Sequence, residues 1–216
     1  SERFILPIRL NDCIPSSAYE RLGKLHWIDI FPKREYQNGL KKILKAVSPT
    51  NLLLRSEPML LTKKEVHDLI RKHDFFDSSR NLLGIGFPHE YKISDINGDS
   101  VVFDSFSCLM WQQSGSLKSI EFEDTQKYID EINMKNFANF SDWRLPTIEE
   151  AMSLMEPEEK NDLYIDPIFD SKQRWIWTAD ILPGKPLAWI VFFKFGDCSC
   201  TVFDFVSSVR AVRSVK

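Results

Sequence analysis

The 216-residue chain carries 28 basic and 31 acidic residues, which gives a formal net charge of -3 at pH 7. Hydrophobic residues make up 43% of it, with 16 Phe and 6 Trp among them, so the sequence predicts a globular protein with a real core and excludes a disordered chain. The charge balance disfavours nucleic acid as a partner, because phosphate binding needs a basic field. No apolar run approaches the roughly 20 residues of a membrane helix, so we expect no membrane segment.

The first 49 residues combine two β-prone runs with one amphipathic helix. The runs are residues 4–10 (FILPIRL) and 25–31 (LHWIDIF), and the helix is predicted over residues 35–47, before Pro49. This order of motifs resembles the C-terminal part of a TIR domain. The resemblance implies a partial α/β (TIR-like) segment over residues 1–49 and self-association through it. In TIR proteins the NAD-cleaving residues lie upstream of this part, so no residue here matches that site.

Residues 50–95 are expected to form a linker with one short helix and a loop. Thr62 is a good N-cap, and Glu65 stands three residues later as its capping-box partner. His67 and His73 are six residues apart and do not share a helix face. We therefore expect solvated histidines and no metal pair.

The stretch YKISDINGDSVVFD predicts a β-hairpin around the Asn-Gly-Asp turn at residues 97–99. The segment LMWQ follows, and a helix is then predicted over residues 119–136 from its apolar spacing. The next helix is predicted to begin after Thr147, with Glu150 as its capping-box partner. Pro146 keeps the residue in front of it extended, so this helix has a strand-like entry.

The motif SDWRLPT at residues 141–147 has two interpretations. Asp142 and Arg144 could bind a ligand, or they could brace the entry to the helix. We favour the brace, with Trp143 as a buried anchor and the two charged residues paired and bonded to nearby backbone, because charges beside a core persist only when they are satisfied.

The last 30 residues predict a strand and its return. Trp189, Val191 and Phe193 alternate on one side, and Gly196–Asp197 forms the turn. The order LMWQ, helix, SDWRLPTIEE, YIDPIFD, WIWTAD, AWIVFF and VRAVR resembles the C-terminal domain family of the Legionella collagen-like protein (Lcl), which has the C-type lectin fold. The resemblance implies an α+β, C-type lectin-like domain over residues 96–216. The residues expected to support this fold are Trp111, Trp143, Arg144, Pro146, Trp177, Trp189 and Arg210.

The resemblance implies a ligand-binding role, since many members of this family act as ligand-binding ends of bacterial surface proteins and some bind polysaccharides. A subgroup resembles the variable proteins of diversity-generating retroelements, whose randomised codons cannot specify Lys, Glu, Gln, Met or Trp. Residues 195–209 contain none of these five. This resemblance implies a diversified ligand face for an unknown protein or carbohydrate, although strand alternation turns about half of any such set inward. The candidate ligand-binding residues are Asp180, Phe193, Phe195, Asp197, Ser199, Thr201, Val202, Asp204, Val206, Ser207 and Ser208.

Catalysis, metal binding and cofactors are disfavoured. Four cysteines are too few for a disulfide scaffold, which favours reduced thiols and a cytoplasmic location. Cys198 and Cys200 would share one face of a strand, but no His or further Cys stands near them in sequence, and they do not match the copper motif of the lectin-like formylglycine-generating enzymes. No nucleophile motif lies near any of the 4 His. We predict a ligand-binding module that is not an enzyme. The alternatives are a structural or protein-interaction module of a TIR-type signalling or defence protein, and a polysaccharide-binding domain.

Overall fold

The computed structural model describes residues 8–9, 28–29 and 54–215. The chain divides into two compact units, Ser1–Thr50 and Asn51–Lys216. In the first unit, β1 (Ile8–Arg9) pairs in parallel with β2 (Ile28–Asp29), and each lies within one of the two predicted runs. The helix expected over residues 35–47 lies outside the described residues.

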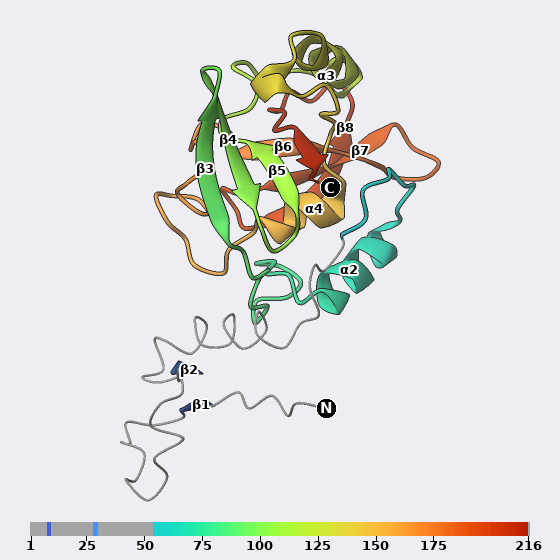
Figure 1. The fold of residues 1–216 in the computed structure, drawn as a ribbon. Helices are drawn as coiled ribbons and strands as arrows, with labels where there is room; N and C mark the ends of the chain where they lie inside the picture. Colours follow the sequence, from blue (N-terminus) through green and yellow to red (C-terminus); the bar gives the residue numbers. More distant parts are fainter. Residues whose placement is uncertain (1–7, 10–27, 30–53, 216) are drawn as a thin grey trace, which may run out of the picture. The chain divides into compact units, whose positions relative to one another are not determined.

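The second unit combines three α-helices with two antiparallel sheets (Figure 1), which confirms the mixed α+β class. The four-stranded sheet has the order β3 (Tyr91–Ile96), β4 (Asp99–Asp104), β5 (Leu109–Gln112) and β9 (Val212–Ser214). The three-stranded sheet has the order β6 (Trp175–Ile181), β7 (Leu187–Phe192) and β8 (Asp197–Val202). The helices are α2 (Lys63–Lys72), α3 (Thr125–Met134) and α4 (Ile148–Ser153), and two 3₁₀ turns are η3 (Phe122–Asp124) and η4 (Phe137–Asn139). Among the described residues, no helix has the length and apolar character needed to cross a membrane.

Local sequence signals place several elements correctly. The β3–β4 hairpin turns through Asn97 and Gly98, whose φ angles are 55° and 88°, and two consecutive positive φ values are the mark of a type I′ turn. Both predicted capping boxes form, Thr62 with Glu65 and Thr147 with Glu150. The helix expected over residues 119–136 is shorter than predicted, because its first residues form η3 before α3 begins.

The middle strand of the three-stranded sheet, β7, is buried on both faces. Trp189 and Val191 of β7 point into one hydrophobic cluster, whereas Ala188 and Ile190 point into another. Period-2 alternation explains this division, and a strand covered on both sides needs the near-continuous apolar run LAWIVF seen in β7.

Residues 54–95 are part of the compact unit and not a linker, which corrects that expectation. Val66 and Ile70 on α2, together with Phe75 and Phe87 after it, are fully or almost fully buried in the same cluster as Trp189. These apolar side chains cannot remain in water without cost, so the segment packs on the domain.

Candidate functional site

The SDWRLPT junction is a structural brace. The Trp143 side chain is 2% exposed, and its indole Nε1 donates to the carbonyl oxygen of Phe137 at 2.9 Å. Its backbone N–H and C=O are both bonded to the side-chain amide of Asn133, each at 2.9 Å. The predicted burial of Trp143 is confirmed.

The two charged residues of this junction do not pair with each other, which corrects that part of the expectation. Arg144 Nη1 and Nη2 donate to the two carboxylate oxygens of the fully buried Glu150, at 2.7 and 2.6 Å. Asp142 instead accepts from Arg213 Nε at 2.6 Å. Glu150 accepts from the Thr147 N–H as part of the α4 cap and also binds Arg144. The SDWRLPT motif therefore depends on a residue of the helix that follows it.

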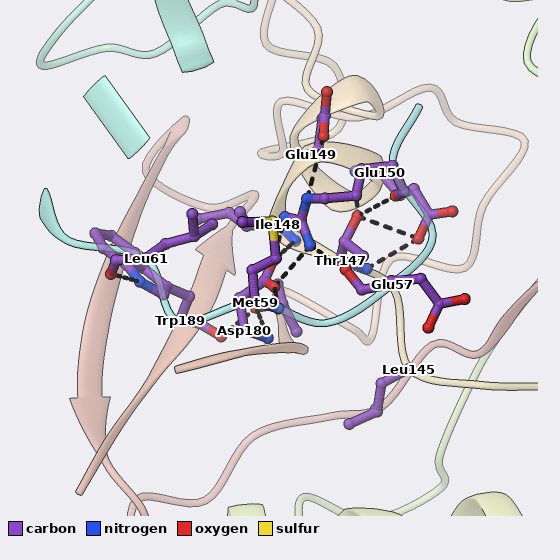
Figure 2. A network of polar contacts seen from close by, with 12 residues as sticks. Glu57, Met59, Leu61, Leu145, Thr147, Ile148, Glu149, Glu150, Asp180 and Trp189 are labelled. Atoms are coloured by element: carbon purple, nitrogen blue, oxygen red, sulfur yellow. Dashed lines mark hydrogen bonds and ion pairs between the residues drawn. The ribbon is translucent and has the colours of Figure 1, made fainter. Parts of the chain in front are cut away.

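Asp180 is the centre of the buried polar network in Figure 2. Its two carboxylate oxygens accept from Arg55 Nη1 and Nη2 at 2.9 and 2.8 Å, and from the backbone N–H groups of Met59 and Ile148, both at 2.7 Å. Burial opposes the charge on Arg55, but the bond to Asp180 and the nearby carboxylates outweigh burial and raise the pKa of Arg55. Asp180 was predicted to bind a ligand. That prediction is wrong for this structure, because every acceptor oxygen is already engaged and the side chain is sealed from solvent.

The same network fastens the segment around Arg55 to the domain. The Thr147 hydroxyl donates to the carbonyl oxygen of Arg55 at 2.8 Å. Farther along, Trp189 Nε1 donates to the carbonyl oxygen of Leu61 at 3.0 Å (Figure 2). Residues 55–61 therefore lie in a fixed position against α4 and the three-stranded sheet.

Two histidines have fixed partners. His73 Nε2 lies 2.7 Å from a Glu149 carboxylate oxygen, so the expectation of a solvated His73 is wrong. His89 lies between Asp104 Oδ2, at 2.8 Å, and the Ser153 carbonyl oxygen, at 2.7 Å. Burial alone would raise the pKa of Asp104, but the His89 bond, together with donors from Ser107 and the backbone, lowers it to about 2.

The cysteine pair is part of the packing. Cys198 and Cys200 lie on β8 and face the same hydrophobic cluster, as strand alternation requires. Burial raises the pKa of the Cys198 thiol, so this sulfur is a poor nucleophile and a poor metal ligand. Within residues 54–215, no three His, Cys, Asp or Glu side chains form a group able to hold a metal ion.

Four of the predicted ligand-binding residues are buried. Asp180, Phe193 and Ser207 are 0% exposed and Ser208 is 8% exposed, so they cannot contribute to an open ligand face. Phe193 packs in the core after β7 ends, and the Ser207 hydroxyl donates to the Trp175 carbonyl oxygen at 3.2 Å. The prediction that these four residues lie on the surface is therefore wrong, because one side of the hairpin and of the segment after it is covered by the core.

The remaining predicted residues separate into two ends of β8. At the turn, Phe195 is 58% exposed and Asp197 is partly exposed. At the opposite end, Val202 and Val206 are 48% and 50% exposed, with the exposed Asp204 between them. Partly exposed Ser199 and Thr201 lie between these ends.

A hollow of about 340 Å³ lies at the second of these ends. Its lining residues are Glu121, Glu123, Pro186, Val202, Phe203 and Asp204. The ring of Phe203 stacks on Phe122 with centroids 4.8 Å apart, and the Phe122 N–H donates to the Phe203 carbonyl oxygen at 2.9 Å. The two walls are thus held together, and the hollow is preformed. We refer to it as the hairpin hollow.

A second hollow, of about 200 Å³, is lined by the neighbouring residues Ile120, Asp124, Lys127, Tyr128 and Glu131. Sequence reasoning missed Glu121 and Glu123, because it assigned residues 119–136 to one helix and did not place that helix beside the hairpin. No local signal in the sequence brings these glutamates to Asp204.

A third hollow, of about 350 Å³, lies on the loop at residues 160–172. Its two aspartates are used by the loop itself: Asp166 accepts from the Ile168 N–H at 2.8 Å, and Asp170 from the Lys172 N–H at 2.7 Å. These bonds stabilise turns. The hairpin hollow is the stronger candidate, because it combines exposed apolar side chains with carboxylates that no local turn uses.

Comparison with known proteins places the C-terminal part of the chain in one family. The model of the family described as the Lcl C-terminal domain matches residues 100–213, which include β5, the SDWRLPT junction and the whole β7–β8 hairpin. A search of curated proteins found no match.

Proposed function

Because the chain belongs to the Lcl C-terminal domain family, we propose that it acts as a ligand-binding module whose binding surface is the hairpin hollow and its rim. Family membership supports a ligand-binding or protein-interaction module. The position of the surface rests on one observation: two exposed residues of the predicted ligand face, Val202 and Asp204, line the hollow, and the exposed Val206 follows them two residues later.

The physical character of this surface suits recognition. Val202 and Val206 place apolar area in water, which a partner can cover with a gain in free energy. Phe203 and Phe205 between them turn inward and pack on Phe122 and Trp177. The exposed residues therefore stand on a rigid base, so binding would cost little conformational entropy.

The finer proposal is a receptor module of C-type lectin-like fold, located in the cytoplasm and attached to a TIR-type signalling region. The exposed residues Val202, Asp204 and Val206 lie within the stretch 195–209, which contains no Lys, Glu, Gln, Met or Trp. Retroelement-driven diversification of this stretch is part of the proposal. Its test is genomic: a near-identical repeat of the coding segment, differing only at adenines, beside a reverse transcriptase gene.

We propose binding without catalysis. Two described histidines, His73 and His89, are held by Glu149 and by Asp104 with Ser153, respectively. Neither is paired with a Ser, Thr or Cys side chain, so neither supplies the nucleophile–base pair of covalent catalysis.

The proposal is tested by probing the purified chain against a glycan array and a displayed peptide library. The Val202→Asp/Val206→Asp variant should lose the wild-type ligands, because charge replaces the apolar rim. The control is Leu83→Asp/Ile93→Asp, which makes the same change at two side chains that are 87% and 52% exposed elsewhere. Retention of every wild-type ligand by the Val202 and Val206 variant would overturn the proposed surface.

A further inference from the structure

We propose that the hairpin hollow binds a basic peptide segment of a partner protein, with lysine or arginine on either side of an apolar side chain. This inference rests on the proposed function and names the class of its ligand.

The hollow is negatively charged. Three of the six lining residues, Glu121, Glu123 and Asp204, carry carboxylates, and none of the six is basic. All three are exposed. Within residues 54–215 no basic side chain forms an ion pair with them. The second hollow, lined by residues next to Glu121 and Glu123 in sequence, adds Asp124 and Glu131 against a single lysine. A cationic ligand is attracted by this field, and an anionic one is repelled.

The carboxylates of the hollow do not form a metal site. Within the described part of the chain, no group of acidic side chains converges closely enough to hold a metal ion. Glu121 and Glu123 come from the segment at η3, and Asp204 comes from the segment after β8. Separate cations on a peptide match separated carboxylates better than a single divalent ion does.

Apolar side chains share the hollow with the carboxylates. Pro186, Val202 and Phe203 line the hollow together with the carboxylates. An apolar side chain of the peptide would be covered there, which adds affinity to the electrostatic attraction and fixes the register of the flanking cations. A simple polycation would gain only the attraction.

The wall of the hollow is fixed in advance, which makes it a docking surface and not a mobile loop. Ile120 and Ser207 exchange two backbone hydrogen bonds, of 2.8 and 3.0 Å, beside it. Together with the stacked rings of Phe122 and Phe203, these bonds hold residues 120–123 against residues 203–207. The carboxylates therefore face a ligand without a prior rearrangement.

The test is fluorescence polarisation with a labelled pentapeptide that alternates lysine and leucine. The comparison peptides alternate lysine with glycine, and glutamate with leucine. We expect the lysine-leucine peptide to bind the full chain at least tenfold more tightly than either. We also expect this binding to weaken as salt rises from about 50 to about 300 mM, because exposed charges are screened.

The decisive variant is Glu121→Lys/Glu123→Lys/Asp204→Lys. Its affinity for the lysine-leucine peptide should be at least tenfold lower than that of the wild type. The matched control is Asp68→Lys/Glu158→Lys/Glu159→Lys, which changes the formal charge equally at exposed positions away from the hollow. Equal weakening by both variants would overturn the inference, since the binding would then follow net charge alone. Failure of the wild type to bind the lysine-leucine peptide would also overturn it.

The occupant and the proposed function are tested separately. If wild-type chains associate in sedimentation and the hollow variant does not, a second copy of the chain occupies the site, and the partner-protein inference is wrong. The wild type could bind a ligand on the array in a way that depends on Val202 and yet show no binding of the lysine-leucine peptide. In that case the proposed function stands and the peptide inference is wrong.

Discussion

The Asp180 network and the hairpin hollow use the same residue types for opposite purposes. Asp180 is fully buried, and four donors from three residues fill its carboxylate oxygens. Asp204 is exposed on the wall of a hollow and has no basic partner among residues 54–215. The difference teaches that the partners of a charged group decide its role: a carboxylate with filled acceptors holds the fold, and one with open acceptors can hold a ligand.

The largest effect is expected at Asp180. Asp180→Ala would leave the Arg55 guanidinium and two N–H groups without their acceptor, so it should lower the free energy of unfolding by about 3–5 kcal/mol. The measurement is urea unfolding followed by circular dichroism. Asp204→Ala is the control and should change the same quantity by less than about 0.5 kcal/mol. If the two variants were equally stable, the contrast between the regions would fail.

Arg144→Ala should have the next largest effect. It removes both hydrogen bonds to the buried Glu150. The free energy of unfolding should fall by about 2 kcal/mol, less than for Asp180, because Arg144 itself is partly exposed. Arg174→Ala, which breaks the exposed pair with Asp162, is the control and should cost less than about 1 kcal/mol. Thermal unfolding distinguishes the two. Ligand binding by folded Arg144→Ala should be unaltered, and a selective loss of binding would assign the junction to the site.

A pH dependence is expected from Asp104, whose folded-state pKa is lowered from 3.8 to about 2. A lowered carboxyl pKa stabilises the fold above the unfolded-state value, and this contribution disappears as pH falls from about 4 to about 2. Asp104→Asn should therefore cost about 2 kcal/mol at pH 7, at about 1.4 kcal/mol per pKa unit. Unfolding measured across this range should show the variant and the wild type converging near pH 2. A constant difference would exclude the carboxylate as the cause.

Signals within a few residues predicted much of the fold. The Asn97–Gly98 turn and the two capping boxes depend on local backbone conformation, which the sequence specifies directly. The burial of Trp143 followed from its size and its place beside a helix entry.

Long-range partners were not predictable from the same signals. Asp180 binds Arg55, which lies 125 positions away in the sequence, and no motif near either residue predicts this pairing. Alternation placed Phe193 on the correct side of β7, but it did not show that the core continues past the end of the strand. The hairpin hollow was half predicted: Val202 and Asp204 were expected, whereas Glu121 and Glu123 come from a segment whose position depends on tertiary packing.

The most direct test of the account is hydrogen exchange of the full chain with and without a ligand found on the array. We predict new protection in residues 120–124 and 200–206, with no change in residues 141–150, because the junction is already braced and lies outside the binding surface. Protection at residues 141–150 without any at residues 200–206 would contradict the account and return the SDWRLPT motif to the binding site.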